Sequence, residues 1–450
     1  MTILRRIVTV PVVCAVGLAG APAAVAVSPP PVDDALLPKP GPPTPPRPTE
    51  QAAPCVNPLR DREVTRAGAQ LAGLDLPTVW RLTRGASQTV AVIDTGVSPH
   101  PMLPRLIPGG DYVAGGDGTE DCDGHGTIIA GIVAASADST AGAFTGVAPD
   151  ATIISIRQSS NKFRPVDQPA ASGFGDVETL ATAVRTAADL GATVINVSSV
   201  ACVPVADALD DRSLGAALSY AVDVMNVVVV AAAGNVGAPG QCPDQNPVDP
   251  AAPNRPDWDN VRVVVSPAWY DDFVLTVGSV APDGTPSPFS LAGPWVDVAA
   301  PGEEVVSLDP DGDGLVDALS ADTGPAPLAG TSYAAPVVTG IAALIRSRWP
   351  QLSARQVMRR IEDTARPPAG GWNAFLGHGV VDPLAAVSGG SEPPLGETET
   401  RRVTVAPPSA ADPHPRRIAF TGAAVCIAVA GVVLLAAAAR RSGRDAVPQD

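Results

Sequence analysis

Lysine is nearly absent from this sequence, and positive charge is in deficit. Only Lys39 and Lys162 are lysines, and the 30 lysines and arginines together face 46 acidic side chains, which gives a formal net charge of −16. This deficit argues against a nucleic-acid binder, which would need a basic face for the phosphates. Hydrophobic residues make up 45% of the 450 positions, so the chain is not disordered as a whole and can bury a sizeable core.

The N-terminus has the composition of an export signal. Arg5 and Arg6 precede the apolar stretch 7–18, and residues 24–26 read Ala-Val-Ala, an A-x-A cleavage site. This pattern predicts a secretory signal peptide over residues 1–26. An uncleaved anchor is the alternative, but the apolar stretch is shorter than the roughly 20 residues that span a membrane.

The C-terminus contains a second apolar run, residues 418–439, without a charged side chain. At about 1.5 Å per residue this run is long enough to cross a hydrocarbon core, and it predicts a single transmembrane helix. A Pro-rich linker over 389–417 precedes it and a cytoplasmic tail over 440–450 follows it. Slightly more arginine follows the run than precedes it, which agrees with the signal peptide in placing the body outside the cell membrane.

The start of this apolar run has a second interpretation. Residues 418–422 read Ile-Ala-Phe-Thr-Gly. The segment resembles a sortase cell-wall sorting signal of the Leu-Ala-x-Thr-Gly kind, with isoleucine in place of the leucine. Processing at Thr421 is therefore an alternative to a retained anchor.

Between the two ends, a Pro-rich extension over 27–73 precedes a body over 74–388 that contains no internal repeat. The body alternates short β-branched runs with helical stretches, which predicts an α/β fold with a parallel sheet and helices on both faces. In such sheets the site lies at the carboxyl ends of the strands. The expected strands are 89–93, 151–156, 193–197, 227–231 and 273–277, and the expected helices are 126–135, 176–190, 213–224 and 332–348.

Two motifs indicate a histidine paired with a carboxylate. His125, one of only four histidines, stands between two glycines directly before an apolar helix, so its imidazole is uncrowded. Asp94 ends a buried strand, where a carboxylate is costly unless a partner holds it. A histidine nitrogen is a suitable partner, and Asp94 would then orient His125 as a general base. Taken singly, a structural histidine and a turn-capping aspartate are the alternatives.

Two further motifs supply a nucleophile and an oxyanion donor. Ser332, in the run Gly-Thr-Ser-Tyr-Ala-Ala-Pro over 330–336, would enter a helix at its N-terminus, where free N–H groups favour a developing anion. Asn235 follows a strand end and a glycine, and can aim its amide at a tetrahedral oxyanion. A serine N-cap and a Gly-Asn turn are the respective alternatives.

The chain order Asp94, His125, Asn235, Ser332 resembles that of the subtilisin-type serine peptidases. The resemblance covers about residues 80–388 and implies a serine endopeptidase with the Asp-His-Ser triad, which acts on proteins or peptides without a cofactor. The segment 199–201 departs from the family, because Ser-Val-Ala stands where an apolar residue and glycines are usual along the substrate-binding edge. We therefore expect a narrower cleft and a specificity unlike that of a broad digestive subtilisin.

The cysteines add two expected cross-links. Cys14 falls in the signal peptide and Cys426 in the transmembrane run, so four cysteines remain in an exported body, enough for two disulfides with three possible connectivities. We expect the pairs Cys55–Cys122, which would tie the extension beside His125, and Cys202–Cys242, which would tie the loops that flank the oxyanion strand.

Residues 309–314 contain the only pattern that suggests a metal. Asp309, Asp311 and Asp313 alternate with small residues in a way that resembles the start of a calcium loop, but the twelfth position is Ser320 and not glutamate. We favour a solvated acidic loop and predict no resident metal.

The signal peptide, short Pro-rich extension, cysteine pattern, Pro-rich linker and single C-terminal span together resemble the mycosins. These are the membrane-anchored subtilisins of actinobacterial type VII (ESX) secretion systems. The resemblance implies work at the outer face of the cell membrane, with secretion-system membrane components or exported proteins as partners, and an extension that wraps the body and stays attached. A non-catalytic structural role in the secretion complex and a degradative surface peptidase are the alternatives.

Overall fold

The computed structural model describes residues 27–59, 69–136, 144–207, 209–238, 241–321 and 324–390. The predicted signal peptide, transmembrane run, cytoplasmic tail, sorting site at Thr421 and all but the first two residues of the linker lie outside these ranges and stay predictions. Across the described ranges, no helix is both long enough and apolar enough to cross a membrane.

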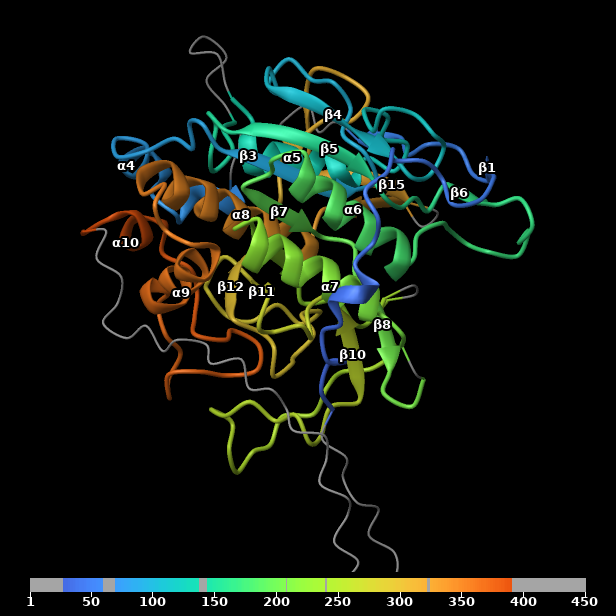
Figure 1. Cartoon of the computed structure of the whole chain (residues 1–450). Helices are drawn as coiled ribbons and strands as arrows, with labels where there is room; N and C mark the ends of the chain where they lie inside the picture. Colours follow the sequence, from blue (N-terminus) through green and yellow to red (C-terminus); the bar gives the residue numbers. More distant parts are fainter. Residues whose placement is uncertain are drawn as a thin grey trace, which may run out of the picture. The chain divides into compact units, whose positions relative to one another are not determined.

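A seven-stranded sheet, parallel throughout, lies at the centre of the body (Figure 1). The order is β12-β11-β9-β7-β3-β5-β4. The strands are β3 (Thr89–Asp94), β4 (Leu106–Asp111), β5 (Thr152–Arg157), β7 (Val194–Val197), β9 (Val228–Ala232), β11 (Leu275–Val280) and β12 (Val298–Pro301). Five of the six residues of β3 are buried, as expected of a central strand that is covered on both faces. All five predicted strands are confirmed.

The prediction omitted the two edge strands, β4 and β12. Strand β4 contains Pro108, Gly109 and Gly110, and its register shifts between Pro108 and Gly110. Proline and glycine are tolerated in a sheet mainly at edges and bulges, so this sequence has a loop-like composition although it forms a strand. Strand β12 has only four residues, too few for a local pattern to stand out.

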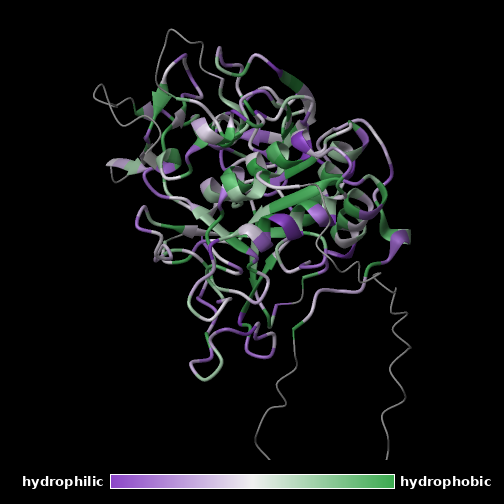
Figure 2. Cartoon of the chain, turned by 90° about the vertical axis from the view of Figure 1, so that its left-hand side faces the viewer, coloured by the Kyte–Doolittle hydropathy of each residue, from purple (hydrophilic) through white to green (hydrophobic). Residues whose placement is uncertain are grey.

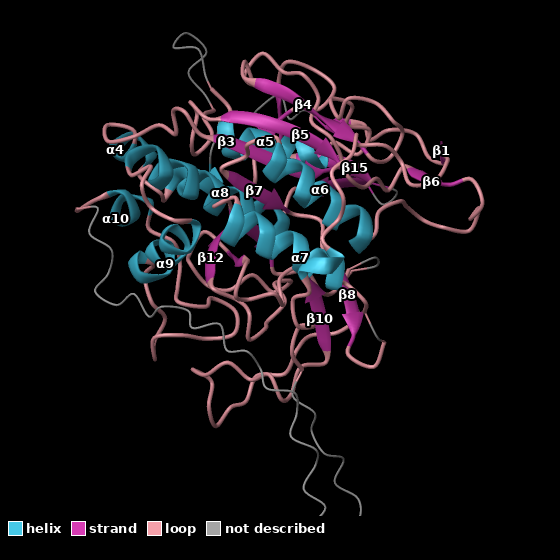
Figure 3. Ribbon diagram, in the orientation of Figure 1, coloured by secondary structure: helices cyan, strands magenta, loops and turns pink. Residues whose placement is uncertain are grey.

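Helices cover both faces of the sheet. α8 (Thr331–Arg348) packs on β7, β9, β11 and β12, and α5 (His125–Ala134) packs on α8 and β3. α6 (Val177–Asp189) packs on β3 and β5, and α7 (Arg212–Ser219), which continues as a π-helical turn over Tyr220–Val224, packs on α6. Figure 3 shows α6 and α7 on the near side of the sheet, with α8 passing behind β7.

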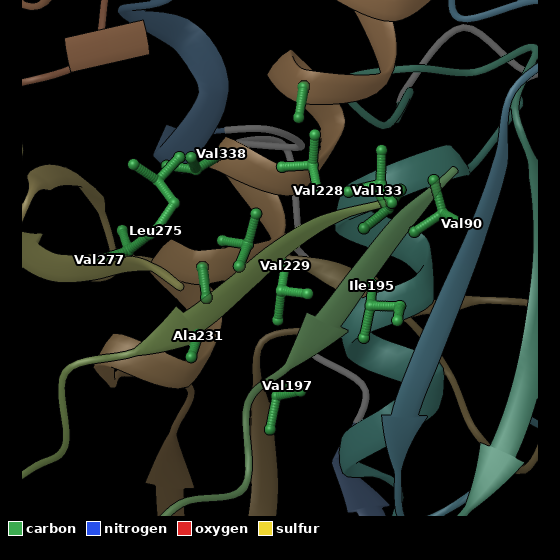
Figure 4. Packing of buried hydrophobic residues seen from close by; sticks show 14 of the residues in the cluster. Val90, Val133, Ile195, Val197, Val228, Val229, Ala231, Leu275, Val277 and Val338 are labelled. Carbon is green, nitrogen blue, oxygen red and sulfur yellow. The ribbon is translucent and has the colours of Figure 1, made fainter. Parts of the chain in front are cut away.

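The core lies between the sheet and these helices. Val90 and Val228 lie on the face of the sheet that α5 and α8 cover, with Val133 and Val338, whereas Ile195 and Val229 lie on the opposite face (Figure 4), and all of these side chains are fully buried. Figure 2 shows the same concentration of hydrophobic residues in the central strands and helices. Burying each such side chain contributes about 1.5–3 kcal/mol relative to leaving it exposed, so the frame beneath the site is rigid.

The N-terminal extension lies along this body, as expected. β1 (Thr49–Gln51) pairs antiparallel with β6 (Phe163–Pro165), and β2 (Pro58–Leu59) pairs antiparallel with β15 (Ala318–Ala321). At its start, the Val27 N–H donates to the Trp258 carbonyl at 3.0 Å. The extension is therefore joined to the body by backbone hydrogen bonds at several separate places.

The remaining helices and strands lie outside the seven-stranded sheet and the four helices described above. They are the helical segments η1 (Asp34–Leu36), α3 (Ala69–Ala72), α4 (Leu76–Val79), α9 (Ala354–Thr364) and α10 (Pro383–Val387), and the strands β8 (Ala201–Pro204), β10 (Val263–Ser266), β13 (Ser307–Leu308), β14 (Leu315–Val316) and β16 (Gly324–Pro327). β8 pairs with β10, β13 with β14, and β16 with β15, all antiparallel.

Candidate active site

The four predicted site residues meet at the carboxyl edge of the sheet. Asp94 is the last residue of β3, His125 the first of α5, and Ser332 the second of α8, while Asn235 follows β9. His125, Asn235 and Ser332 line one cleft of about 900 Å³. Asp94 is fully buried behind His125. The structure thus brings together residues that lie up to 238 positions apart, since 332 − 94 = 238.

Asp94 and His125 form a buried hydrogen-bonded pair. His125 Nδ1 lies 2.7 Å from Asp94 Oδ1, and the His125 side chain is 23% exposed. Burial lowers the pKa of His125, but the charge and hydrogen bond of Asp94, with smaller contributions from Asp121 and Asp123, raise the pKa above its usual value overall. A proton held on Nδ1 by the carboxylate leaves Nε2 with a free lone pair for base chemistry.

The residue directly after His125, Gly126, must be a glycine. A Cβ at this position would lie 2.0 Å from the Gly96 carbonyl oxygen, far inside van der Waals contact. Only glycine lets the start of α5 approach the end of β3 closely enough for His125 to reach Asp94.

Thr331 holds the amide of Asn235, a role that sequence reasoning missed. Asn235 Oδ1 accepts from the Thr331 N–H at 2.9 Å and from Thr331 Oγ1 at 3.1 Å. Asn235 Nδ2 and Ser332 Oγ both lie close to where a Cβ on Gly330 would stand, at 3.5 and 3.1 Å. The amide donor and the hydroxyl therefore face the same small space. In the sequence, the sign of this role is the polar residue Thr331 directly before Ser332.

The back of the site is closed by Tyr333 and Ser198. The Tyr333 ring lies 5.3 Å from the His125 ring, tilted by 48°, and Tyr333 is buried. Ser198 Oγ donates to the Ser332 carbonyl at 2.9 Å. These contacts fix the first turn of α8 against the end of β7 and limit the movement of Ser332.

Both expected disulfides are confirmed. Cys55 and Cys122 are bonded, as are Cys202 and Cys242. The second bond lines the cleft, and the Cys242 N–H donates to the Asn235 carbonyl at 2.8 Å. The cross-link therefore supports the segment that presents the asparagine amide.

Several segments of the chain form the walls of the cleft. Residues 199–201, where the sequence departs from the subtilisin pattern, line it together with parts of the segment 158–177, Val56 of the extension and Leu319 of β15. The Lys162 carbonyl accepts from the N–H groups of Ala52 and Ala53. The extension thus supports one wall of the cleft, and Ser-Val-Ala occupies the edge as the sequence suggested.

The acidic loop forms a tight hairpin between β13 and β14. The Asp309 N–H donates to the Gly314 carbonyl at 3.0 Å, and His100 Nε2 lies 3.2 Å from the same oxygen. Asp309 is buried, whereas Asp311 and Asp313 are exposed. Throughout the described part of the chain, no three His, Cys, Asp or Glu side chains are arranged to hold a metal ion.

Comparison with known proteins agrees with this geometry. A family model described as the subtilase family matches residues 85–379. Mycosin-4 of Mycobacterium tuberculosis is 57% identical over 444 residues, which cover 96% of this chain and 95% of the relative. The crystal structure of MycP1 from Mycobacterium smegmatis is 42% identical with a TM-score of 0.77, over 85% of this chain and 100% of that one. A chain of an intact ESX-5 inner membrane complex is 42% identical with a TM-score of 0.75, over 92% of this chain and 100% of that one.

Proposed function

The chain belongs to the mycosins, subtilisin-like serine peptidases of the subtilase family, and we propose that Ser332, His125 and Asp94 carry its peptidase activity at the outer face of the cell membrane. The observation that carries this proposal is the buried Asp94–His125 pair at 2.7 Å, behind a cleft that His125 shares with Ser332 and Asn235. A buried carboxylate that orients a histidine at the lining of a cleft suits a general base, and packing alone does not explain it.

The chemistry follows from the positions of these groups. Ser332 Oγ attacks the scissile carbonyl carbon while His125 Nε2 takes the hydroxyl proton, and Asp94 stabilises the imidazolium that forms. Asn235 Nδ2 and the Ser332 N–H donate to the oxyanion of the tetrahedral intermediate. His125 then gives the proton to the leaving amine as the C–N bond breaks, which leaves an ester on Ser332. Water, deprotonated by His125, hydrolyses that ester and restores the serine.

The location and partners of the chain are inferred from its two end segments and from the solved structures that it resembles. The predicted signal peptide and the apolar run 418–439 would place the body outside the membrane with the C-terminus in the cytoplasm. One similar structure is a chain of an intact ESX-5 inner membrane complex, and another belongs to the periplasmic assembly of that complex. We therefore infer that this peptidase works beside type VII secretion membrane components and acts on proteins that they export.

The same relatives favour a second, structural role. Presence in a membrane assembly does not require a nucleophile, so the chain could also stabilise a secretion complex. Complementing a deletion strain with Ser332→Ala separates the two roles. Restored export would assign the essential role to assembly, and lost export would assign it to catalysis.

Serine-directed fluorophosphonate labelling of the full-length protein in detergent tests the chemistry. We expect labelling of the wild type and of Ser347→Ala, because Ser347 lies near the other end of α8 and is not among the residues that line the cleft. We expect none for Ser332→Ala at an unchanged melting temperature. Equal labelling of Ser332→Ala and wild type would remove Ser332 as the nucleophile.

A further inference from the structure

Asp121 is a partly buried carboxylate beside the active site that the proposed mechanism does not use. It lies four residues before His125, in the loop that leads into α5. Its neighbour Cys122 is bonded to Cys55 of the extension. Asp121 is not among the residues that line the cleft, and its side chain contacts residues at the end of β3 and the start of α5.

Both oxygens of Asp121 accept two hydrogen bonds. Oδ1 accepts from Thr95 Oγ1 and from the Gly124 N–H, each at 2.8 Å. Oδ2 accepts from the Thr127 N–H at 2.8 Å and from Thr127 Oγ1 at 2.7 Å. Two of these donors are fixed backbone N–H groups on either side of His125, which makes the carboxylate an unusually complete cap for the start of α5.

Thr95 extends this set of hydrogen bonds to Asp94; Asp121, Thr95 and their partners are called the bracket below. The Thr95 hydroxyl donates to Asp121 and accepts from the Gly126 N–H at 3.0 Å. The Thr95 N–H in turn donates to Asp94 Oδ1 at 2.8 Å, the same oxygen that receives His125 Nδ1. A continuous path of hydrogen bonds therefore joins Asp121 to the catalytic carboxylate on β3 and to the backbone of α5 on both sides of the histidine.

From this geometry we propose that Asp121 is a positioning residue for the reaction: its ionised carboxylate joins the end of β3 to the start of α5 and so fixes the Asp94–His125 pair. The inference rests on the proposed peptidase function. It assigns no contact with substrate to Asp121, which acts only through Thr95 and the first turn of α5.

The bracket depends on pH as well. Burial raises the pKa of Asp121 to about 6, with a smaller contribution from Asp94, although the hydrogen bonds from Thr127 and Thr95 oppose the rise. The other titratable groups around it are His125, Asp123 and Tyr333. Protonation would place a hydrogen on an oxygen that already faces two donors, and the cap would weaken. As the pH falls through about 6, the site therefore loses the hydrogen bonds that the Asp121 carboxylate accepts.

The test is the second-order rate of fluorophosphonate labelling of the full-length protein, measured from about pH 5 to 9. Asp121→Asn keeps the shape but turns an amide N–H₂ toward backbone N–H donors. We expect labelling to slow roughly tenfold at the alkaline plateau, as for a small misplacement of reacting groups. We also expect the acid limb to move to lower pH and to become less steep, because Asp121 no longer titrates and no longer raises the pKa of His125.

Asp117→Asn is the matched control. Asp117 is an exposed aspartate in the same loop whose side chain, among the described residues, accepts hydrogen bonds only from Thr119, and the variant should label like the wild type. Equal rates and equal acid limbs for Asp121→Asn and wild type would overturn the inference alone. Absence of labelling in the wild type would overturn the proposed function and this inference with it.

A second pair of variants decides the matter if Asp121→Asn does not fold. Thr95→Ser retains the bridging hydroxyl, whereas Thr95→Val removes it at nearly constant volume. We expect Thr95→Val to reproduce the slower labelling and Thr95→Ser to restore most of the rate. Equal rates for the two Thr95 variants would show that the bracket does not position the pair.

Discussion

Replacing Asp94 by asparagine tests how the buried carboxylate acts on His125. Asp94 Oδ1 accepts from the Thr95 N–H at 2.8 Å and from His125 Nδ1 at 2.7 Å. An asparagine with its carbonyl oxygen at that position still accepts from both groups, so the tautomer of His125 is retained. The amide nitrogen then takes the place of Oδ2, which is buried and has no hydrogen-bond partner among the described residues.

The variant mainly loses the negative charge that faces the imidazolium. Two unit charges about 4 Å apart interact by ~4 kcal/mol at an effective dielectric constant near 20, which corresponds to a rate factor of about 10³. Loss of the correct tautomer as well costs about 10⁴ in serine peptidases. We therefore expect Asp94→Asn to be about 10³-fold slower, and its buried, unpaired amide to lower the free energy of unfolding by about 1–3 kcal/mol.

Fluorophosphonate labelling rates measure the first effect and urea unfolding measures the second. His125 must be neutral to act as a base, so activity falls as the pH drops through its pKa. Because Asp94 raises that pKa, the acid limb of Asp94→Asn should lie at lower pH than that of the wild type. A variant within tenfold of the wild-type rate, or one with an unmoved acid limb, would refute the reasoning.

Two other predictions follow from the hydrogen bonds of Thr331 and from the buried ion pair of Arg157. Thr331→Val removes one of the two hydrogen bonds that hold the Asn235 amide and leaves the buried Gly234 N–H without its acceptor. It should slow labelling up to about tenfold and lower the unfolding free energy by about 1–3 kcal/mol, whereas Thr331→Ser should stay near the wild type in both; similar rates for both variants would contradict the assignment. Arg157→Met leaves the buried Asp111, 3.3 Å from the guanidinium, without its cation and should lower the unfolding free energy by about 3–5 kcal/mol in urea titration. Arg212→Met, at an exposed ion pair, should leave it nearly unchanged, and equal effects for both arginines would refute the distinction.

Local sequence patterns predicted the central strands and the site residues well. The run 89–94 is apolar up to a terminal aspartate, and only a buried strand that ends at a site accounts for both features. His125 and Ser332 could be placed because each stands at the start of an apolar helix beside glycines. The end of a strand and the start of a helix are fixed by short-range preferences, which a single sequence reveals.

The parts that escaped prediction depend on contacts between distant segments. The pairing of β1 with β6 and of β2 with β15 holds the extension against segments that line the cleft, such as Lys162 and Leu319, yet neither β1 nor β2 has a sequence pattern that predicts its partner. Asp121 lies next to Cys122 in an unremarkable acidic loop, and its role emerges only when β3 lies beside α5. The roles of such residues depend on contacts that form only when segments distant in the sequence fold together.

The central claim is that Ser332, activated by the Asp94–His125 pair, cleaves peptide bonds. The most direct test is to incubate the full-length protein with a proteome-derived peptide library and to identify new peptide ends by mass spectrometry, with Ser332→Ala as the control. We predict new ends from the wild type, with a restricted set of residues before the cut because residues 199–201 line the cleft, and none from Ser332→Ala. The same new ends from both proteins, or none from a folded wild type that labels with fluorophosphonate, would contradict it.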